Sequence, residues 1–199
     1  MKCELIIERD GKPIYRGKTK SFLKNFGSVL AGMLKNTGAG DAAKYASVTN
    51  TAGASANAIV EDYVTYTGWS FGPMTFNAGD NDDSYGIQVG SGSDPVSYND
   101  YKLASKISHG ISTGQLDYET HSVVSSYSDT SSYIEISRSF INKTSSDVIV
   151  REVGLVARSW DTGRGVDTKF LVVRDVLPAP VKVKPLGSLT VRYRVSLST

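Results

Sequence analysis

The fold is decided by residues 133–176, which read YIEISRSFINKTSSDVIVREVGLVARSWDTGRGVDTKFLVVRDV. Three runs rich in β-branched and apolar residues are separated by two turn-forming segments, which predicts a three-stranded antiparallel meander. Because side chains alternate across a strand, the best-matched register of the first two strands places Arg138 opposite Glu152. We expect these two charges to form a structural pair that fixes the register and has no catalytic role.

Shorter strands are predicted on both sides of this meander. Asp10-Gly11 lies between two extended runs and predicts an opening hairpin. Apolar residues at every second position from Leu189 to Leu197 predict a half-buried final strand. Cys3, at an alternating position of the first strand, is expected to be a small buried hydrophobe. Prolines at positions 178, 180 and 185 restrict that stretch to an edge strand or a linker.

One helix is predicted, over residues Ser21 to Leu34. Its apolar residues recur at the spacing of one helical face, and Ser21 is placed to accept a backbone N–H as the N-cap. Gly27 and Gly32 each weaken the helix by about 1 kcal/mol relative to alanine, so packing on a sheet must support it. We therefore expect Phe26 to be buried against that sheet.

About ten short strands and one N-terminal amphipathic helix predict a mainly β protein, an antiparallel two-sheet sandwich for which a jelly roll is one arrangement. We expect a single domain over residues 1–199, with a long loop-rich excursion at about 39–84 that orders against neighbouring subunits. The remaining predicted segments are a loop over 98–107 and strands over 45–49, 59–67, 85–89 and 115–127.

The composition is that of an ordinary globular protein. The 199 residues are 40% hydrophobic, and 22 basic against 20 acidic residues give a formal charge of +2. That balance favours neither nucleic acid nor an anionic membrane as a main partner. No apolar run approaches the ~20 residues that span a bilayer. Charges interrupt the first residues, so we expect synthesis in the cytoplasm without a signal peptide.

Phosphate-binding and nucleophile motifs are incomplete. Gly17-Lys18-Thr19 resembles the end of a phosphate-binding loop, but Lys12 stands where that motif needs its first glycine. Gly90-Ser91-Gly92 is followed by Asp-Pro and not by a helix, so we interpret it as a turn. No GxSxG elbow is present. The Asn142 glycosylation sequon is interpreted as a turn.

Metal and sugar sites are also weakly indicated. Asp80, Asp82 and Asp83 lack the remaining ligands of a calcium loop, so we expect a solvated acidic loop. His109 and His121, the only histidines, lack ligand-spaced partners and are expected at the surface or in turns. Trp69, Trp160 and Tyr133 could line a sugar-binding face, but we favour core or interface positions. The prediction is thus no catalytic residue, no cofactor and no metal.

Five segments are distinctive when they are read together: GIQVGSGSDPVSYNDYKL at 86–103, GQLDY at 114–118, SRSFINKTSSDVIVREVGL at 137–155, FLVVRDVL at 170–177 and GSLTVRYRVSL at 187–197. With a weaker match in SFLKNF at 21–26, they resemble a recurrent family of virion structural proteins of tailed bacteriophages and related prokaryotic viruses. The resemblance implies a β-rich subunit of a head, neck or tail that has no catalytic residues and works through repeated contacts.

The resulting expectation is a noncatalytic component of the virion, made in the host cytoplasm. It would self-assemble and dock on other virion proteins, as a homo-oligomer with no direct contact to nucleic acid or membrane. The alternatives are a carbohydrate- or receptor-binding module of a viral fibre, and a hydrolase. On a glycan array, a carbohydrate-binding module should give specific binding and a pure scaffold should give none. A hydrolase would instead show a pocket with convergent titratable groups and shifted pKa values.

Overall fold

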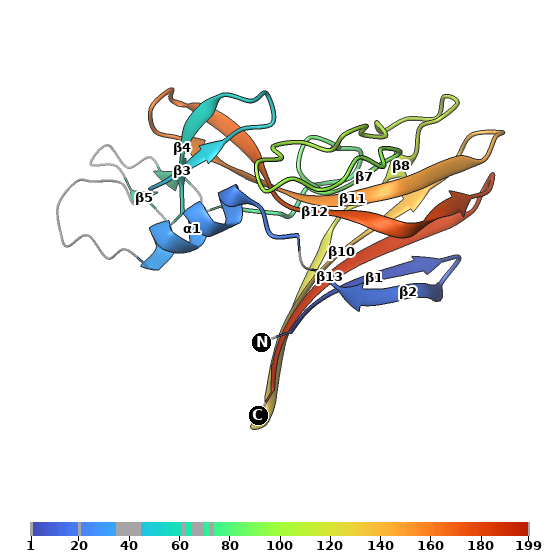
Figure 1. The fold of residues 1–199 in the computed structure, drawn as a ribbon, viewed down its shortest axis with the longest axis horizontal. Coiled ribbons are helices and arrows are strands. Elements are labelled where there is room, and N and C mark those ends of the chain that lie inside the picture. Colours follow the sequence, from blue (N-terminus) through green and yellow to red (C-terminus); the bar gives the residue numbers. More distant parts are fainter. Residues whose placement is uncertain are drawn as a thin grey trace.

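A computed structural model describes residues 2–19, 21–34, 45–60, 63–64, 70–71 and 74–198. It is mainly β, with two antiparallel sheets and a single helix among the described residues, which confirms the predicted sandwich class (Figure 1). The strands are β1 Lys2–Arg9, β2 Lys12–Lys18, β3 Tyr45–Thr49, β4 Ser55–Ile59, β5 Tyr63–Val64, β6 Ser70–Phe71, β7 Gly86–Gly90, β8 Asp117–Tyr118, β9 Ser122–Tyr127, β10 Ser131–Ile141, β11 Val148–Asp161, β12 Val166–Val183 and β13 Ser188–Ser198, and the helix is α1 Lys24–Leu34.

The first sheet has the order β2-β1-β13-β10, with β8 and β9 both pairing the far side of β10. Its opening hairpin turns at Asp10 and Gly11, whose φ angles of 50° and 72° suit the short polar and glycine residues found there. Its last strand, β13, lies in the middle between β1 and β10. The predicted hairpin and the predicted final strand are therefore both confirmed.

The second sheet is built on the long hairpin of β11 and β12. On its other side β11 pairs with β7 and, through Asp161, with β4, which continues to β3. In β12, Val176 lies opposite Glu152 and Val181 opposite Val150, so the four residues 177–180 bulge out opposite a single residue of β11. This bulge contains Pro178 and Pro180 on an edge strand, which confirms the placement expected for the prolines.

The core lies between the two sheets, because one cluster of buried side chains draws on both. Leu5, Phe140 and Tyr193 come from the first sheet, and Val150 and Phe170 come from the second. All five side chains are at most 3% exposed. A sheet that buries only one face requires this arrangement, since each sheet covers the apolar face of the other.

Helix α1 begins three residues later than predicted. Before it, the backbone of Leu23 donates to Val172 of β12 and Ser21 accepts from Arg174, so this segment runs along an edge of the second sheet and Ser21 is not the N-cap. Phe26 is partly buried and packs on Phe22 with ring centroids 4.4 Å apart. The helix is thus held against the second sheet, as expected, although Leu30 remains 47% exposed.

The predicted meander is wrong in its first strand. β10 and β11 belong to different sheets, so Arg138 does not lie opposite Glu152. The turn between them is a crossover, organised by Asn142, whose side-chain amide donates to the carbonyls of Ser146 and Val183. Hydrophobic alternation indicates that two segments are strands, but it does not say which strands pair.

Other predicted elements differ in extent. The strand over 115–127 is divided into β8 and β9, and the segment 98–107 is a loop, as predicted. The strand over 45–49 is confirmed as β3, and the strand over 85–89 is shifted by one residue to β7. The strand over 59–67 overlaps β4 and β5, while residues 61–62 and 65–69 and much of the excursion at 39–84 lie outside the described residues.

Candidate functional site

The first buried charge cluster is centred on Arg138 of β10, which is 1% exposed. Its guanidinium donates to five backbone carbonyls, with the shortest distances of 2.7 Å to Glu119 and to Asp82, and it lies 4.7 Å from the ring centroid of Tyr118. Burial lowers the pKa of Arg138, and nearby acidic groups partly oppose that shift. The N–H groups of the guanidinium all donate to backbone carbonyls, so Arg138 holds the loop around residues 79–87 against the first sheet.

The second cluster is centred on Glu152 and Arg174, on the paired strands β11 and β12. Their side chains are 0% and 2% exposed and are joined by a 2.8 Å bond from Nε to the carboxylate. Burial disfavours the charge on Arg174, but hydrogen bonds to Glu152 and Asp100 outweigh it and raise the pKa. The Glu152 carboxylate also accepts the backbone N–H groups of Gly92, Ala104 and Ser105.

This second cluster explains the segment 86–103, one of the two long stretches that carry the viral resemblance. Its first residues form β7, and its glycine-, serine- and proline-rich remainder is a loop that folds over Glu152 and Arg174. A Cβ at Gly92 would collide with the Glu152 carboxylate, so only glycine permits this approach. We interpret the motif as structural: it gives the buried pair its remaining hydrogen-bond partners.

His121 is not at the surface as predicted, whereas His109 is partly exposed and lies outside the named strands. His121 is buried, accepting the N–H of Ile87 at Nε2 over 2.5 Å while its Nδ1 lies 3.2 Å from the carbonyl of Ala78. Burial, helped by the charge of Arg138, lowers the pKa of His121 to about 4. His109 is half-buried, with Nδ1 3.4 Å from the carboxylate of Asp117. Each histidine thus helps to join loops to the first sheet.

The acidic run at residues 80–83 is also more structural than expected. Asp82 accepts the N–H of Ser84, and Asp83 accepts the N–H of His109 and pairs with Lys106 at 3.1 Å. Across the part of the chain that the structure describes, no three His, Cys, Asp or Glu side chains are grouped to hold a metal ion. In the same residues no helix is long and apolar enough to cross a membrane.

Asp175 is another buried acid, and it lies next to Cys3. Its carboxylate accepts the hydroxyls of Thr19 and Tyr193, and burial raises its pKa despite these bonds. Burial, together with the charges of Asp175 and Glu4, raises the pKa of the half-exposed Cys3 thiol to about 11. The thiol is therefore protonated at neutral pH, which makes it a poor nucleophile.

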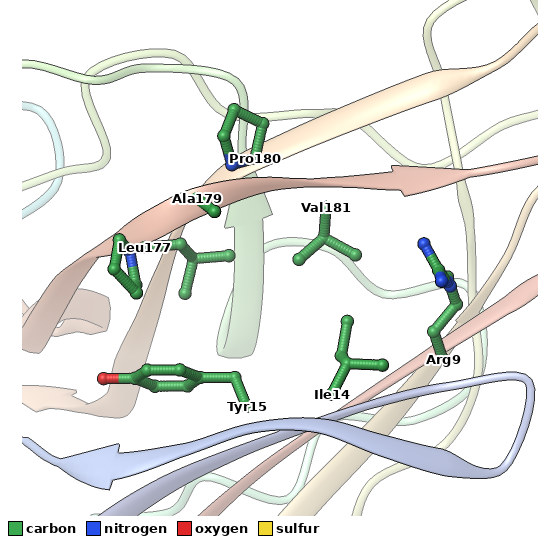
Figure 2. A pocket seen from close by; sticks show the side chains of 8 residues that line it. Arg9, Ile14, Tyr15, Leu177, Ala179, Pro180 and Val181 are labelled. Atoms are coloured by element: carbon green, nitrogen blue, oxygen red, sulfur yellow. The ribbon is translucent and has the colours of Figure 1, made fainter.

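A surface groove lies between the opening hairpin and the bulge of β12. Figure 2 shows Ile14 and Tyr15 of β2 on one side and Leu177, Ala179 and Val181 on the other, with Arg9 at one end. The groove has a volume of about 270 Å³, and Ile14 is 42% exposed. Such a groove can accept a small apolar group beside a cation, but it contains no carboxyl or histidine.

The most open surface is a projection of the first sheet, which we call the arm and define as residues 122–135 with 194–197. Figure 1 shows this end of β10 and β13 extending away from the two-sheet body, past β1. The face of the arm that continues the core carries exposed apolar side chains, including Ile134 at 48% and Leu197 at 53%. The opposite face is charged, with Glu135 bonded to Arg192 and Arg194.

No family model, curated protein or solved structure matches this chain. The functional argument therefore depends on the surfaces and clusters described above, together with the resemblance of the quoted segments.

Sequence reasoning missed the arm and the buried pair of Glu152 with Arg174. The alternation from Leu189 to Leu197 was interpreted as one half-buried strand, whereas Leu189 is 0% and Leu197 53% exposed. The sequence of β9, SVVSSY, could have indicated the arm, because it is compatible with a strand but lacks the large apolar side chains of a core strand. Of the predicted aromatic candidates, Tyr133 stacks under Arg194 at 4.8 Å, Trp160 is part of β11, and Trp69 lies outside the described residues.

Proposed function

We propose that the chain is a noncatalytic structural component of a virus particle, in the head, neck or tail of a tailed bacteriophage or related prokaryotic virus. It acts by self-assembly and by docking on neighbouring virion proteins. The observation that carries this proposal is the arm, where the core-facing side of the first sheet continues beyond the second sheet and no described part of the chain covers it. Contiguous exposed apolar surface of this kind is typical of protein interfaces.

The buried clusters support a structural role. Arg138 and Glu152 each join a long loop to a sheet through backbone groups, and their side chains are 1% and 0% exposed. These loops are therefore held in one conformation, which suits a subunit that must present the same surface in every copy. The resemblance of residues 86–103 and 137–155 to virion proteins involves the same two clusters.

Purified particles provide the direct test. We expect mass spectrometry to detect the chain in particles produced by a host that carries the gene, in copies proportional to particle number. A non-structural protein from the same infected cells is the control and should be lost during purification. A chain that is abundant in infected cells but removed with that control would contradict the proposal.

A glycan- or receptor-binding role is the alternative, and the groove in Figure 2 is the observation that favours it. An aromatic ring offers an apolar face to a ligand, and Tyr15 at one end of the groove and Arg9 at the other provide such a ring and a cation. A glycan array would show specific binding that Tyr15→Ala abolishes if this alternative holds. A scaffold that uses the arm should bind no glycan, with or without Tyr15.

A further inference from the structure

The two edges of the first sheet differ in character: β2 forms one edge, and β8 and β9 lie along the other, beside β10. β2 carries Lys12, Pro13 and Lys18, and its pairing with β1 contains a register irregularity. Charges, proline and bulges are the features that stop an edge from pairing with another strand. β9 reads SVVSSY, has no charge or proline, is exposed at all six residues and pairs with β10 without a register shift. This edge is open to a further strand.

The backbone of β9 shows which groups are available. Ser128 donates its N–H to the carbonyl of Ser131 at the end of the hairpin. Hydrogen-bonded and non-hydrogen-bonded pairs alternate along an antiparallel ladder, so the N–H and C=O groups of Val123, Ser125 and Tyr127 point away from β10. A strand added here would meet three donors and three acceptors at every second residue.

The side chains of the same three residues lie on the apolar face of the arm. The register puts Val123 beside Ile136 and Ser125 beside Ile134, on the side that buries Phe140 farther along β10. Val123 is 51% and Tyr127 75% exposed. A strand pairing with β9 would therefore also cover apolar surface.

We propose that β9 pairs antiparallel with β9 of a second copy of this chain, around a two-fold axis at Ser125. Ser125 then lies opposite its own copy, and Val123 lies opposite Tyr127 of the second copy on the apolar face. Every outward-pointing backbone group of the three residues finds a partner. This inference rests on the proposed function, because it specifies the contact through which the subunits self-assemble.

Self-complementarity favours a second copy over another partner. A two-fold antiparallel pair must place one residue opposite itself. Centring it on Ser125 makes two valine–tyrosine pairs, a favourable combination of β-branched and aromatic residues. Centring it on Val124 would instead leave Tyr127 opposite the buried His121. β9 itself contains no charged residue, so pairing it with a second β9 places no like charges directly opposite each other within the strand.

The contact is small. Each copy offers the six residues of β9, whereas a standard interface uses about 20–30 residues a side. We therefore expect an affinity in the micromolar range, suited to contacts that are repeated in an assembly.

Cysteine cross-linking of the full chain tests the register. Opposite residues of a hydrogen-bonded pair have Cα atoms about 5.5 Å apart, within the range that a disulfide bridges. We expect Ser125→Cys to form a covalent dimer under mild oxidation. Ser126→Cys is the matched control, because its two copies would lie about 8 Å apart, too far to bridge. The wild-type chain controls for Cys3, whose pKa of about 11 keeps it unreactive.

Ser125→Lys gives a second measurement, independent of disulfide chemistry. It sets two lysines opposite each other on an exposed strand, so the concentration-dependent dimer seen by sedimentation of the wild type should be lost while circular dichroism stays unchanged. Equal cross-linking at positions 125 and 126, a dimer only with Val124→Cys, or a Ser125→Cys cross-link to a different virion protein would each overturn the proposed pairing. If the chain is found in particles but Ser125→Cys forms no dimer, the pairing is wrong and the proposed function still holds. If the dimer forms but the chain is not incorporated into particles, the proposed function is wrong and the pairing still holds.

Discussion

Arg138 and Arg174 are both buried, and their charges are stabilised by different kinds of hydrogen-bond partner. Arg138 is surrounded by backbone carbonyls, while Arg174 is bonded to the carboxylates of Glu152 and Asp100. A buried charge without partners is very costly, so either solution is acceptable but an incomplete one is not. The pairing of Arg138 with Glu152 expected from the sequence would have left Arg174 inside the protein without a carboxylate at its Nε.

A double-mutant cycle on Glu152 and Arg174 should show strong coupling. We expect Glu152→Leu or Arg174→Met alone to lower the free energy of unfolding by about 3–5 kcal/mol, because each leaves the other charge buried and uncompensated. The double variant should lose much less than the sum of the two. Urea unfolding of the four proteins measures this coupling.

The control cycle combines Glu152→Leu with Arg138→Met. These side chains belong to different sheets and share no hydrogen-bond partner, so their losses should add to within about 0.5 kcal/mol. Coupling as strong as in the first cycle would show that the two clusters act as one.

His121 should make the protein sensitive to mild acid. Its folded-state pKa of about 4 lies below the ordinary value of 6.5, so the unfolded chain binds the proton more readily. The stability contributed by neutral His121 is complete above pH 6.5 and falls by about 3 kcal/mol as the pH drops to 4. Thermal unfolding across this range should show that decline.

His121→Gln provides the comparison for this pH effect. The variant should be less stable at pH 7, because the N–H of Ile87 loses its acceptor, but its stability should fall less steeply between pH 6.5 and pH 4. An unchanged slope would assign the acid sensitivity to another group. Glu4, whose pKa is lowered to about 2 by hydrogen bonds from Arg16 and Lys2, contributes stability that is lost only between about pH 4.5 and 2.

At the scale of elements, helix α1 is joined to two strands by one polar side chain. Asn25 is 3% exposed; its amide donates to the carbonyls of Thr49 in β3 and Leu171 in β12, and its oxygen accepts the N–H of Thr49. The helix therefore covers the place where the edge of β3 would otherwise have free backbone groups. Apolar spacing predicted the helix but gave no reason for an asparagine on its buried side.

Asn25→Leu should destabilise the protein by about 3 kcal/mol, because it keeps the size of the side chain but removes the partner of one buried and two partly buried backbone groups. Leu30→Ala, at a position that is 47% exposed on the same helix, should cost less than about 1 kcal/mol. Chemical denaturation distinguishes the two. Similar losses at both positions would indicate that the helix is held by general packing and not by the Asn25 hydrogen bonds.

For the whole molecule, a core shared by two sheets predicts one cooperative unfolding transition. Phe140 of the first sheet and Phe170 of the second are both 0% exposed in the same cluster. Replacing either by alanine should cost about 3–5 kcal/mol and shift the same calorimetric transition. Ile134→Ala, in the arm, should leave that transition nearly unchanged. Two transitions, each sensitive to only one phenylalanine, would show that the sheets unfold separately.

The fold class and most of the strands could be predicted from local sequence patterns. Alternation and turn chemistry are local, so the Asp10-Gly11 hairpin, β3, β13 and the hairpin of β11 with β12 could all be found without coordinates. The position of the prolines on an edge also followed locally, because proline lacks the N–H that an inner strand needs. The prediction of no motif-based active site likewise used only the spacing of residues.

The neighbours of each strand, and the apolar residues that remain exposed, depend on long-range contacts that local patterns do not encode. β10 and β11 follow each other in the chain but join different sheets, since the Asn142 turn crosses between layers. Pairing is a long-range property, and a period of two is equally compatible with several partners. For the same reason Leu189 and Leu197 look alike in the sequence, whereas the second sheet covers one and leaves the other exposed on the arm.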